Sequence, residues 1–129
     1  MLLPVLQGVF SSYNAELTGA EEYLLQALRN NPDNSFAAGR LAVVYAEMRQ
    51  MDRAREMAER ATEEIDPLDH HAAFDRACVL SLSGEKQKSL EWLNRAIDLG
   101  WRCAHHYRME RNLSGVRNEA AFALLLERL

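Results

Sequence analysis

The 129-residue sequence is poor in cysteine and in β-branched residues. Its two cysteines, Cys78 and Cys103, lie 25 residues apart without a CxxC motif, which is typical of reduced thiols in a reducing compartment. Only 10 residues are valine, isoleucine or threonine, against 18 alanines and 19 leucines, and this balance favours helix over sheet. The composition predicts a single all-α domain, and we expect a cytoplasmic location.

The chain also lacks an excess of positive charge. It has 15 lysines and arginines against 19 aspartates and glutamates, which gives a net charge of −4. Nucleic acids and anionic lipid surfaces attract basic proteins, so neither is an expected partner. The apolar start, residues 1–6, carries no basic flank and no A-x-A cleavage pattern, so we expect no signal peptide.

Motifs of catalysis are missing as well. The sequence has no G-x-S-x-G, no glycine-rich phosphate loop and no HExxH motif. Cys78 lies seven residues after His71, too far along one helix for a hydrogen bond between them. We therefore predict a protein that is not an enzyme and that needs no cofactor.

Histidine occurs as two adjacent pairs, His70–His71 and His105–His106, which are 35 residues apart. Adjacent side chains on a helix point about 100° apart, so each pair is expected to offer a metal one ligand at most. No metal site is predicted, and a position on the surface or at a helix start is the preferred interpretation.

What the sequence does have is a repeat of 34 or 35 residues. Small residues recur at this interval in three series, namely Gly8, Ala42 and Ala77; Ala20, Ala54 and Ser89; and Ala27, Ala61 and Ala96. Pro32 and Pro67 are 35 residues apart, and counting from Ala61 places a one-residue insertion before Pro67. Small residues at fixed intervals indicate places where helices pack closely.

Apolar residues inside each unit follow helical spacing in two blocks, which predicts antiparallel helical hairpins. In the first unit, Thr18 and Glu21 have the spacing of a capping box, so a second helix is expected to begin there. A hairpin cannot bury its apolar stripe alone, and stacking of three hairpins is therefore expected.

These residues resemble the tetratricopeptide repeat, which has a period of about 34 residues, the same small positions and a proline near its end. Leu41, Tyr45 and Gly84 also match that family's pattern. The resemblance implies a right-handed α-solenoid of three hairpins, at about residues 1–34, 35–69 and 70–101, within one domain of residues 1–129. Residues 102–129 are similar to an ending found on bacterial members, which implies capping helices over the last apolar face.

In this family the first helix of each hairpin lines a groove that binds a partner peptide or helix. The groove positions implied for this chain are Phe36, Arg40, Val43, Glu47, His71, Phe74, Asp75 and Cys78. Phe36 and Phe74 are either exposed anchors or packed against neighbouring hairpins. Arg40 and Asp75 are expected to form an ion pair, which leaves Glu110, 35 residues further on, without a compensating charge.

The resulting hypothesis is a non-catalytic module that binds a protein or peptide in this groove. One alternative is a regulatory or sensory tail of a larger bacterial signalling or transcription protein. Another is a self-assembling scaffold, in which an N-terminal hairpin packs on a second copy through its apolar residues Leu2, Leu3, Val5, Leu6, Val9 and Phe10.

Overall fold

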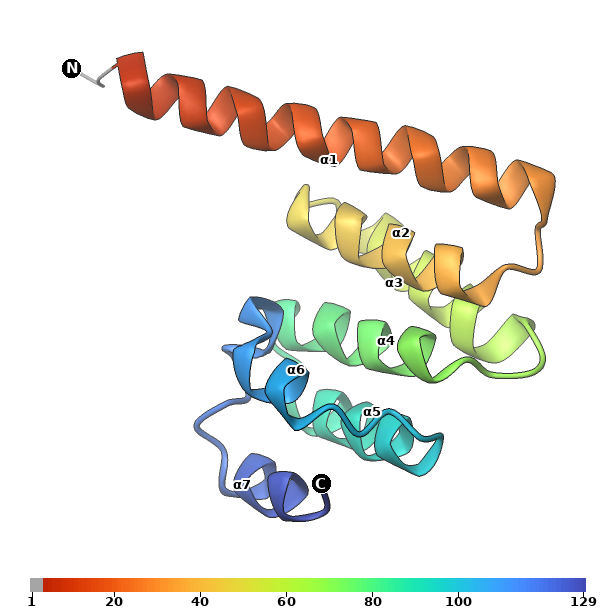
Figure 1. Ribbon diagram of the computed structural model, residues 1–129, viewed down its shortest axis with the longest axis vertical. Coiled ribbons are helices and arrows are strands. Elements are labelled where there is room, and N and C mark those ends of the chain that lie inside the picture. The colour runs from red at the N-terminus through yellow and green to blue at the C-terminus, as the bar shows by residue number, and fades with distance from the viewer. Residues whose placement is uncertain (1–3) are drawn as a thin grey trace.

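The computed structural model describes the backbone of residues 4–129 and the side chains of residues 14–129. Within these residues the chain is all-α and contains seven α-helices and two short helical turns, which confirms the predicted class (Figure 1). The helices are α1 (Pro4–Asn30), α2 (Ser35–Glu47), α3 (Met51–Glu59), α4 (His70–Leu82), α5 (Lys86–Asp98), α6 (Ala104–Met109) and α7 (Ala120–Glu127). A π-helical turn, η1, spans Arg60–Glu64, and a 3-10 turn, η2, spans Arg111–Leu113.

The helices pack in chain order, each against its neighbours (Figure 1). Residues 48–50 join α2 to α3 and residues 83–85 join α4 to α5, and such short connections make each pair antiparallel. The two pairs are stacked, because α4 contacts both α2 and α3. At the two ends of the stack, α1 lies on α2 and α7 lies on α5.

The expected hairpin in residues 1–34 is wrong, because α1 is one continuous helix. Thr18 does not cap a second helix; its Oγ1 donates a hydrogen bond to the carbonyl of Asn14, one turn earlier in the same helix. No proline lies between Pro4 and Pro32, and Gly19 alone does not stop a helix. Leu17, Leu24 and Leu28 form the apolar stripe that α1 buries against the rest of the domain.

The expected self-association surface cannot be a hairpin for the same reason. Leu2 and Leu3 lie outside the described residues, and the side chains of Val5, Leu6, Val9 and Phe10 lie outside the described side chains. Self-association of this segment therefore stays a prediction.

The small residues of the second and third units are all fully buried. Ala42, Ala54, Ala61, Ala77, Ser89 and Ala96 have no exposed surface. Ser89, the one polar member, donates a hydrogen bond from Oγ to the carbonyl of Ala77 at 2.7 Å, so its hydroxyl is satisfied inside the core. In α1, Ala20 and Ala27 are only partly buried, because this helix has a neighbour on one side.

The one-residue insertion placed before Pro67 coincides with the π-helical turn Arg60–Glu64. A π-helix holds one residue more per turn than an α-helix, so it can absorb an extra residue without ending the helix. Arg76 of α4 fastens this turn, since its Nη1 donates to Thr62 Oγ1 at 2.8 Å and pairs with Glu63 at 3.0 Å.

The helices α2 and α4 end in the same type of cap. The N–H of Gln50 bonds to the carbonyl of Tyr45, and the N–H of Glu85 bonds to that of Leu80, which is the Schellman pattern. The residue before each donor has a left-handed backbone, with φ of 66° at Arg49 and 81° at Gly84. Only glycine adopts this conformation without strain, so Arg49 destabilises its cap.

Replacing Arg49 with glycine is expected to raise the free energy of unfolding by about 1 kcal/mol, because the left-handed backbone then carries no side-chain strain. Urea unfolding followed by circular dichroism measures the change. Gly84→Ala is the matched opposite and should lower stability by a similar amount. An unchanged or lower stability of Arg49→Gly would contradict the assigned conformation.

The helices α2 and α4 approach each other closely at Gly39. A Cβ atom on Gly39 would lie 3.0 Å from the Cα of Ala72 and 3.2 Å from Asp75 Oδ2. Because a backbone atom cannot swing aside as a side chain can, a methyl group at this position would push the two helices apart.

Gly39→Ala is therefore expected to lower the free energy of unfolding by about 1–3 kcal/mol, the usual cost of overpacking. Gly19→Ala is the matched control, since nothing lies within 4 Å of a Cβ at that position. In the exposed middle of α1 the same substitution should raise stability by about 0.5–1 kcal/mol through helix propensity. Equal effects of the two substitutions in denaturant unfolding would refute the close contact.

The end of the chain, where capping helices were expected, consists of the short helix α6, the turn η2 and the last helix α7. Tyr107 of α6, Leu113 of η2, and Phe122 and Leu125 of α7 are buried. Arg128 pairs with Asp98 of α5 and donates to Asn94 Oδ1 at 2.7 Å, so the chain end is bound to α5. Among the described residues, no helix has the length and apolar character needed to cross a bilayer.

Candidate functional site

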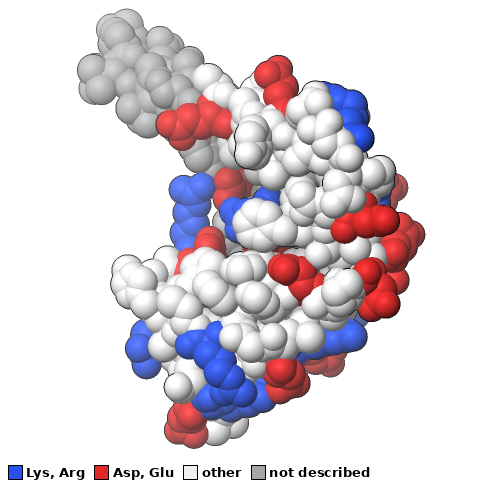
Figure 2. Space-filling model, turned by 45° about the vertical axis from the view of Figure 1, so that its right-hand side comes forward, with Lys and Arg blue, Asp and Glu red and all other residues white. Residues whose placement is uncertain are grey.

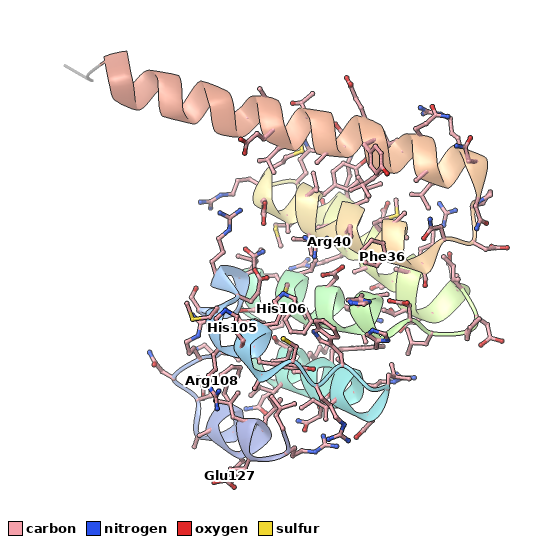
Figure 3. The ribbon with its side chains drawn as sticks, in the orientation of Figure 1. Phe36, Arg40, His105, His106, Arg108 and Glu127 are labelled. Carbon is pink, nitrogen blue, oxygen red and sulfur yellow. The ribbon has the colours of Figure 1, made fainter. Side chains whose placement is uncertain are left out.

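A pocket of about 860 Å³ lies between α2, α4 and residues 101–112, and we name it the aromatic pocket. Figure 2 shows this hollow on the left side of the molecule, open to solvent, with acidic and basic side chains along its wall. Figure 3 labels Phe36 and Arg40 on α2 and His105 and His106 on α6, on opposite walls. The pocket thus joins residues that are up to about 76 positions apart in the chain (36 to 112).

Six of the eight residues expected in the groove line the aromatic pocket. They are Phe36, Arg40, Glu47, His71, Phe74 and Asp75. Phe36 is 47% exposed and matches the alternative of an exposed anchor. Phe74 is 1% exposed and matches the alternative of a packed residue.

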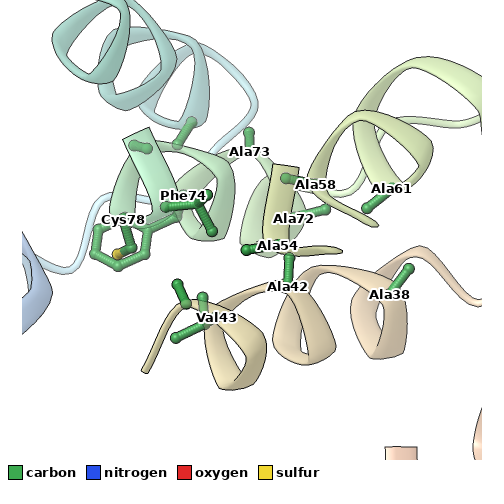
Figure 4. Close-up of a cluster of buried hydrophobic side chains, with 14 of the residues drawn as sticks. Ala38, Ala42, Val43, Ala54, Ala58, Ala61, Ala72, Ala73, Phe74 and Cys78 are labelled. Carbon is green, nitrogen blue, oxygen red and sulfur yellow. The ribbon is translucent and has the colours of Figure 1, made fainter. Parts of the chain in front are cut away.

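The expectation that Val43 and Cys78 face the groove is wrong. Both are buried, at 2% and 1% exposure, in the cluster of alanines that joins α2 to α4 (Figure 4). Burial raises the pKa of the Cys78 thiol well above its usual range, and Asp75 nearby raises it further. Cys78 is therefore a protonated core residue at neutral pH.

A chain of aromatic rings runs along the pocket from α2 to α6. Phe36 meets His71 edge to face with centroids 5.4 Å apart, and His71 lies 4.5 Å from Trp101. Trp101 meets His106 at 5.5 Å, and His106 stacks on Phe74 at 4.4 Å. These contacts connect α2, α4 and α6, so the rings fix the relative positions of the three walls.

Sequence reasoning missed that residues 101–112 form a wall of the pocket, among them Trp101 and Met109. A signal for the latter was present, because Met109 lies 35 residues after Phe74 and His106 lies 35 after His71. Extending the groove positions by one further interval would have placed both residues in the pocket. No such spacing marks Trp101.

Arg40 and Asp75 form the expected ion pair, with Nη1 2.9 Å from Oδ1. The Asp75 side chain is 2% exposed and that of Arg40 is 39% exposed, so the carboxylate is buried and the guanidinium is not. Burial raises the pKa of Asp75 to about 7, although the positive charge of Arg40 lowers it. Asp75 Oδ2 is buried without a hydrogen-bond partner, beside Gly39.

Glu110, expected to lack a compensating charge, is hydrogen-bonded within the chain. His106 Nε2 lies 3.2 Å from Glu110 Oε2, and the N–H of Asn112 donates to Glu110 Oε1. His106 Nδ1 accepts a hydrogen bond from Trp101 Nε1 at 3.1 Å. Because an indole N–H can only donate, Nδ1 carries no proton, and the imidazole is the neutral tautomer with its proton on Nε2, directed at Glu110.

The third carboxylate of the pocket, Glu47, joins α2 to η2. Its Oε1 accepts a hydrogen bond from Asn112 Nδ2 at 3.0 Å, and its Oε2 lies 3.3 Å from Arg111 Nη2. All three carboxylates of the pocket are therefore engaged with a basic or amide group of the chain itself.

The first histidine pair, His70–His71, differs from the expectation that each pair offers a metal one ligand at most. Asp69, His70 and His71 bring their ligand atoms within 4.8 Å of one another, so the first pair does not offer one ligand only. The 100° argument holds inside a helix, but Asp69 is the extended N-cap and His70 is the first helical residue. Burial lowers the pKa of His71, and His70 lowers it further, while Asp69 raises it.

No protein-family model matches this sequence, and no curated protein is significantly similar to it. The candidate site therefore rests on the geometry of the chain itself.

The buried carboxyl of Asp75 predicts a pH dependence of stability. The pKa is about 7 in the folded state and about 3.9 in an unfolded chain. The folded state therefore holds the proton more tightly, so the contribution of Asp75 to the free energy of unfolding falls as pH rises from about 4 to about 7.

Asp75→Asn should remove this dependence, because the amide does not titrate. We expect the stability of the wild type relative to Asp75→Asn to decrease over that range by about 1.4 kcal/mol per unit of pKa difference at most. Urea unfolding at pH 4, 5, 6 and 7 measures it. A difference that is constant over this range, or that rises with pH, would show that the carboxyl is ionised in the fold throughout.

Proposed function

We propose that this chain is a non-catalytic protein-interaction module whose aromatic pocket binds a segment of a partner protein. The observation that carries the proposal is that apolar side chains of the pocket are exposed while its carboxylates are engaged within the chain. Phe36 and Met109 are 47% and 66% exposed on the pocket walls, while the pocket carboxylates are bonded within the chain. Exposed apolar side chains that gather in a hollow are typical of interaction sites.

Binding is proposed to be driven by burial of Phe36 and Met109 against apolar side chains of the partner. The pocket volume of about 860 Å³ lies in the range of about 300–1,000 Å³ usual for ligand sites, and its open side leaves room for a chain to continue beyond it. Arg40 and His71 lie beside Phe36 and are the groups that would orient polar parts of the segment.

The absence of catalysis is part of the same proposal. His106, which lines the pocket, has both ring nitrogens engaged in hydrogen bonds, one with Trp101 and one with Glu110. The buried Cys78 is held as a thiol by its raised pKa, so it is a poor nucleophile. Neither arrangement supports a nucleophile with an adjacent general base.

We also propose that the pairs α2–α3 and α4–α5 are tetratricopeptide-like repeats of a right-handed solenoid. The supporting observations are the 35-residue interval between the left-handed caps Arg49 and Gly84, and the burial of the small residues at equivalent places. Helices α2 and α4 begin at Ser35 and His70, the first residues of the second and third expected units.

The proposal predicts that Phe36→Ala combined with Met109→Ala weakens partner binding at least tenfold, because each exposed anchor loses its buried contact. Affinity capture from a lysate of the source cells, with bound proteins quantified by mass spectrometry, identifies the partner, and titration with that partner measures the loss.

The matched control combines Tyr23→Ala and Leu124→Ala, which remove two exposed apolar side chains, 76% and 64% exposed, that do not line the pocket. These substitutions should leave binding unchanged. A partner that binds the wild type, the pocket variant and the control variant equally would refute the proposed site.

A further inference from the structure

The start of α4 holds a group of metal-ligating side chains that the proposed function does not use. Asp69, His70 and His71 place one ligand atom each within 4.8 Å of the others, and all three residues are partly buried. Among the described residues this is the one such group of three. Asp69 Oδ1 lies 3.5 Å from His71 Nδ1.

We propose that Asp69, His70 and His71 bind a divalent transition-metal ion of the zinc class at the rim of the aromatic pocket. Two imidazoles and one carboxylate form a common ligand set for Zn²⁺ and Ni²⁺. Bonds of about 2.0–2.2 Å place tetrahedral ligand atoms about 3.4 Å apart. The three ligand atoms lie within 4.8 Å of one another, so small side-chain rotations bring them to this separation.

The imidazoles of His70 and His71 both contact the indole of Trp101. The ring of His70 lies 4.1 Å from that of His71 and stacks on Trp101 with a centroid distance of 5.6 Å. His71 lies 4.5 Å from the same indole. Trp101 is itself fixed by its hydrogen bond to His106, so it provides a rigid platform that reduces the ordering cost of binding a metal.

Binding is compatible with the cap of α4. Asp69 Oδ1 accepts hydrogen bonds from the N–H groups of His71 and Ala72, which leaves Oδ2 as the metal ligand. A helix N-terminus disfavours a cation, but the carboxylate of Asp69 offsets this effect at the same point. The second histidine pair is less suited, because both nitrogens of His106 are engaged.

Three protein ligands leave at least one coordination position for water or a ligand atom of another molecule. His71 also lines the aromatic pocket, so the metal would stand at its edge. The inference does not depend on the proposed function, since a metal can bind whether or not the pocket receives a protein segment.

The test uses the untagged full chain with Trp92→Phe and Cys103→Ser. The first change leaves Trp101 as the single tryptophan, and the second removes an exposed thiol that could itself bind metal. Zn²⁺ binding is measured by calorimetry, and Ni²⁺ binding by quenching of Trp101 fluorescence. We expect one ion per chain with a dissociation constant in the micromolar range or below, and Trp101 quenching that saturates at the same ratio.

His70→Ala and His71→Ala should each weaken Zn²⁺ binding at least tenfold. Asp69→Asn should weaken it as well while preserving the fold, because asparagine caps a helix as well as aspartate does. His105→Ala, which removes an exposed histidine outside the group, is the matched control and should bind as the parent does.

Millimolar or undetectable Zn²⁺ binding by the parent would overturn the inference. Retention of binding by the double variant His70→Ala/His71→Ala, or an equal loss in His105→Ala, would also overturn it. Circular dichroism of each variant separates a loss of binding from a loss of folding, and Asp69→Asn supplies a folded variant in which the site alone is changed.

Discussion

The close contact between α2 and α4 at Gly39 and Ala72 is the constraint on which the rest of the structure depends. Because Gly39 has no side chain, the two helices approach until its Cα faces backbone. The next residue of α2, Arg40, then reaches Asp75, one turn after Ala72 on α4. The same approach leaves Asp75 Oδ2 buried beside Gly39 without a partner. One missing Cβ thus permits the helix spacing at which Arg40 and Asp75 form their ion pair.

The ion pair in turn shapes what the pocket offers. Burying a carboxylate costs several kcal/mol unless a partner compensates it, and Arg40 supplies this compensation to Asp75 while its side chain stays 39% exposed. Glu47 and Glu110 are bonded to η2 and α6 in the same way. The polar groups therefore hold the walls together, and the exposed side chains of Phe36 and Met109 carry the surface that remains for a ligand.

The 35-residue spacing in the sequence predicted the helix pairs α2–α3 and α4–α5, and it failed where local structure outweighs it. The 35-residue interval placed α2–α5 and the Arg40–Asp75 pair correctly, because small buried residues and their neighbours follow helical periodicity. It predicted a hairpin over residues 1–34, although no strong helix breaker lies between Pro4 and Pro32 and α1 is one continuous helix. The spacing also could not predict how deeply each side chain is buried. Val43 and Cys78 occupy groove positions by counting, but the close approach of α2 and α4 buries both.

The third wall of the aromatic pocket is built by the segment that follows the last helix pair, and this couples the pocket to the end of the chain. Tyr107 Oη donates a hydrogen bond to the carbonyl of Trp101 at 2.6 Å, which fixes the turn that leads into α6. Trp101 then contacts both histidines of α4 and binds His106. A segment held between α2 and residues 101–112 would contact both walls, so its binding energy would also stabilise the docking of the chain end on α4. Residues 101–112 therefore do more than cover an apolar face: they complete the pocket.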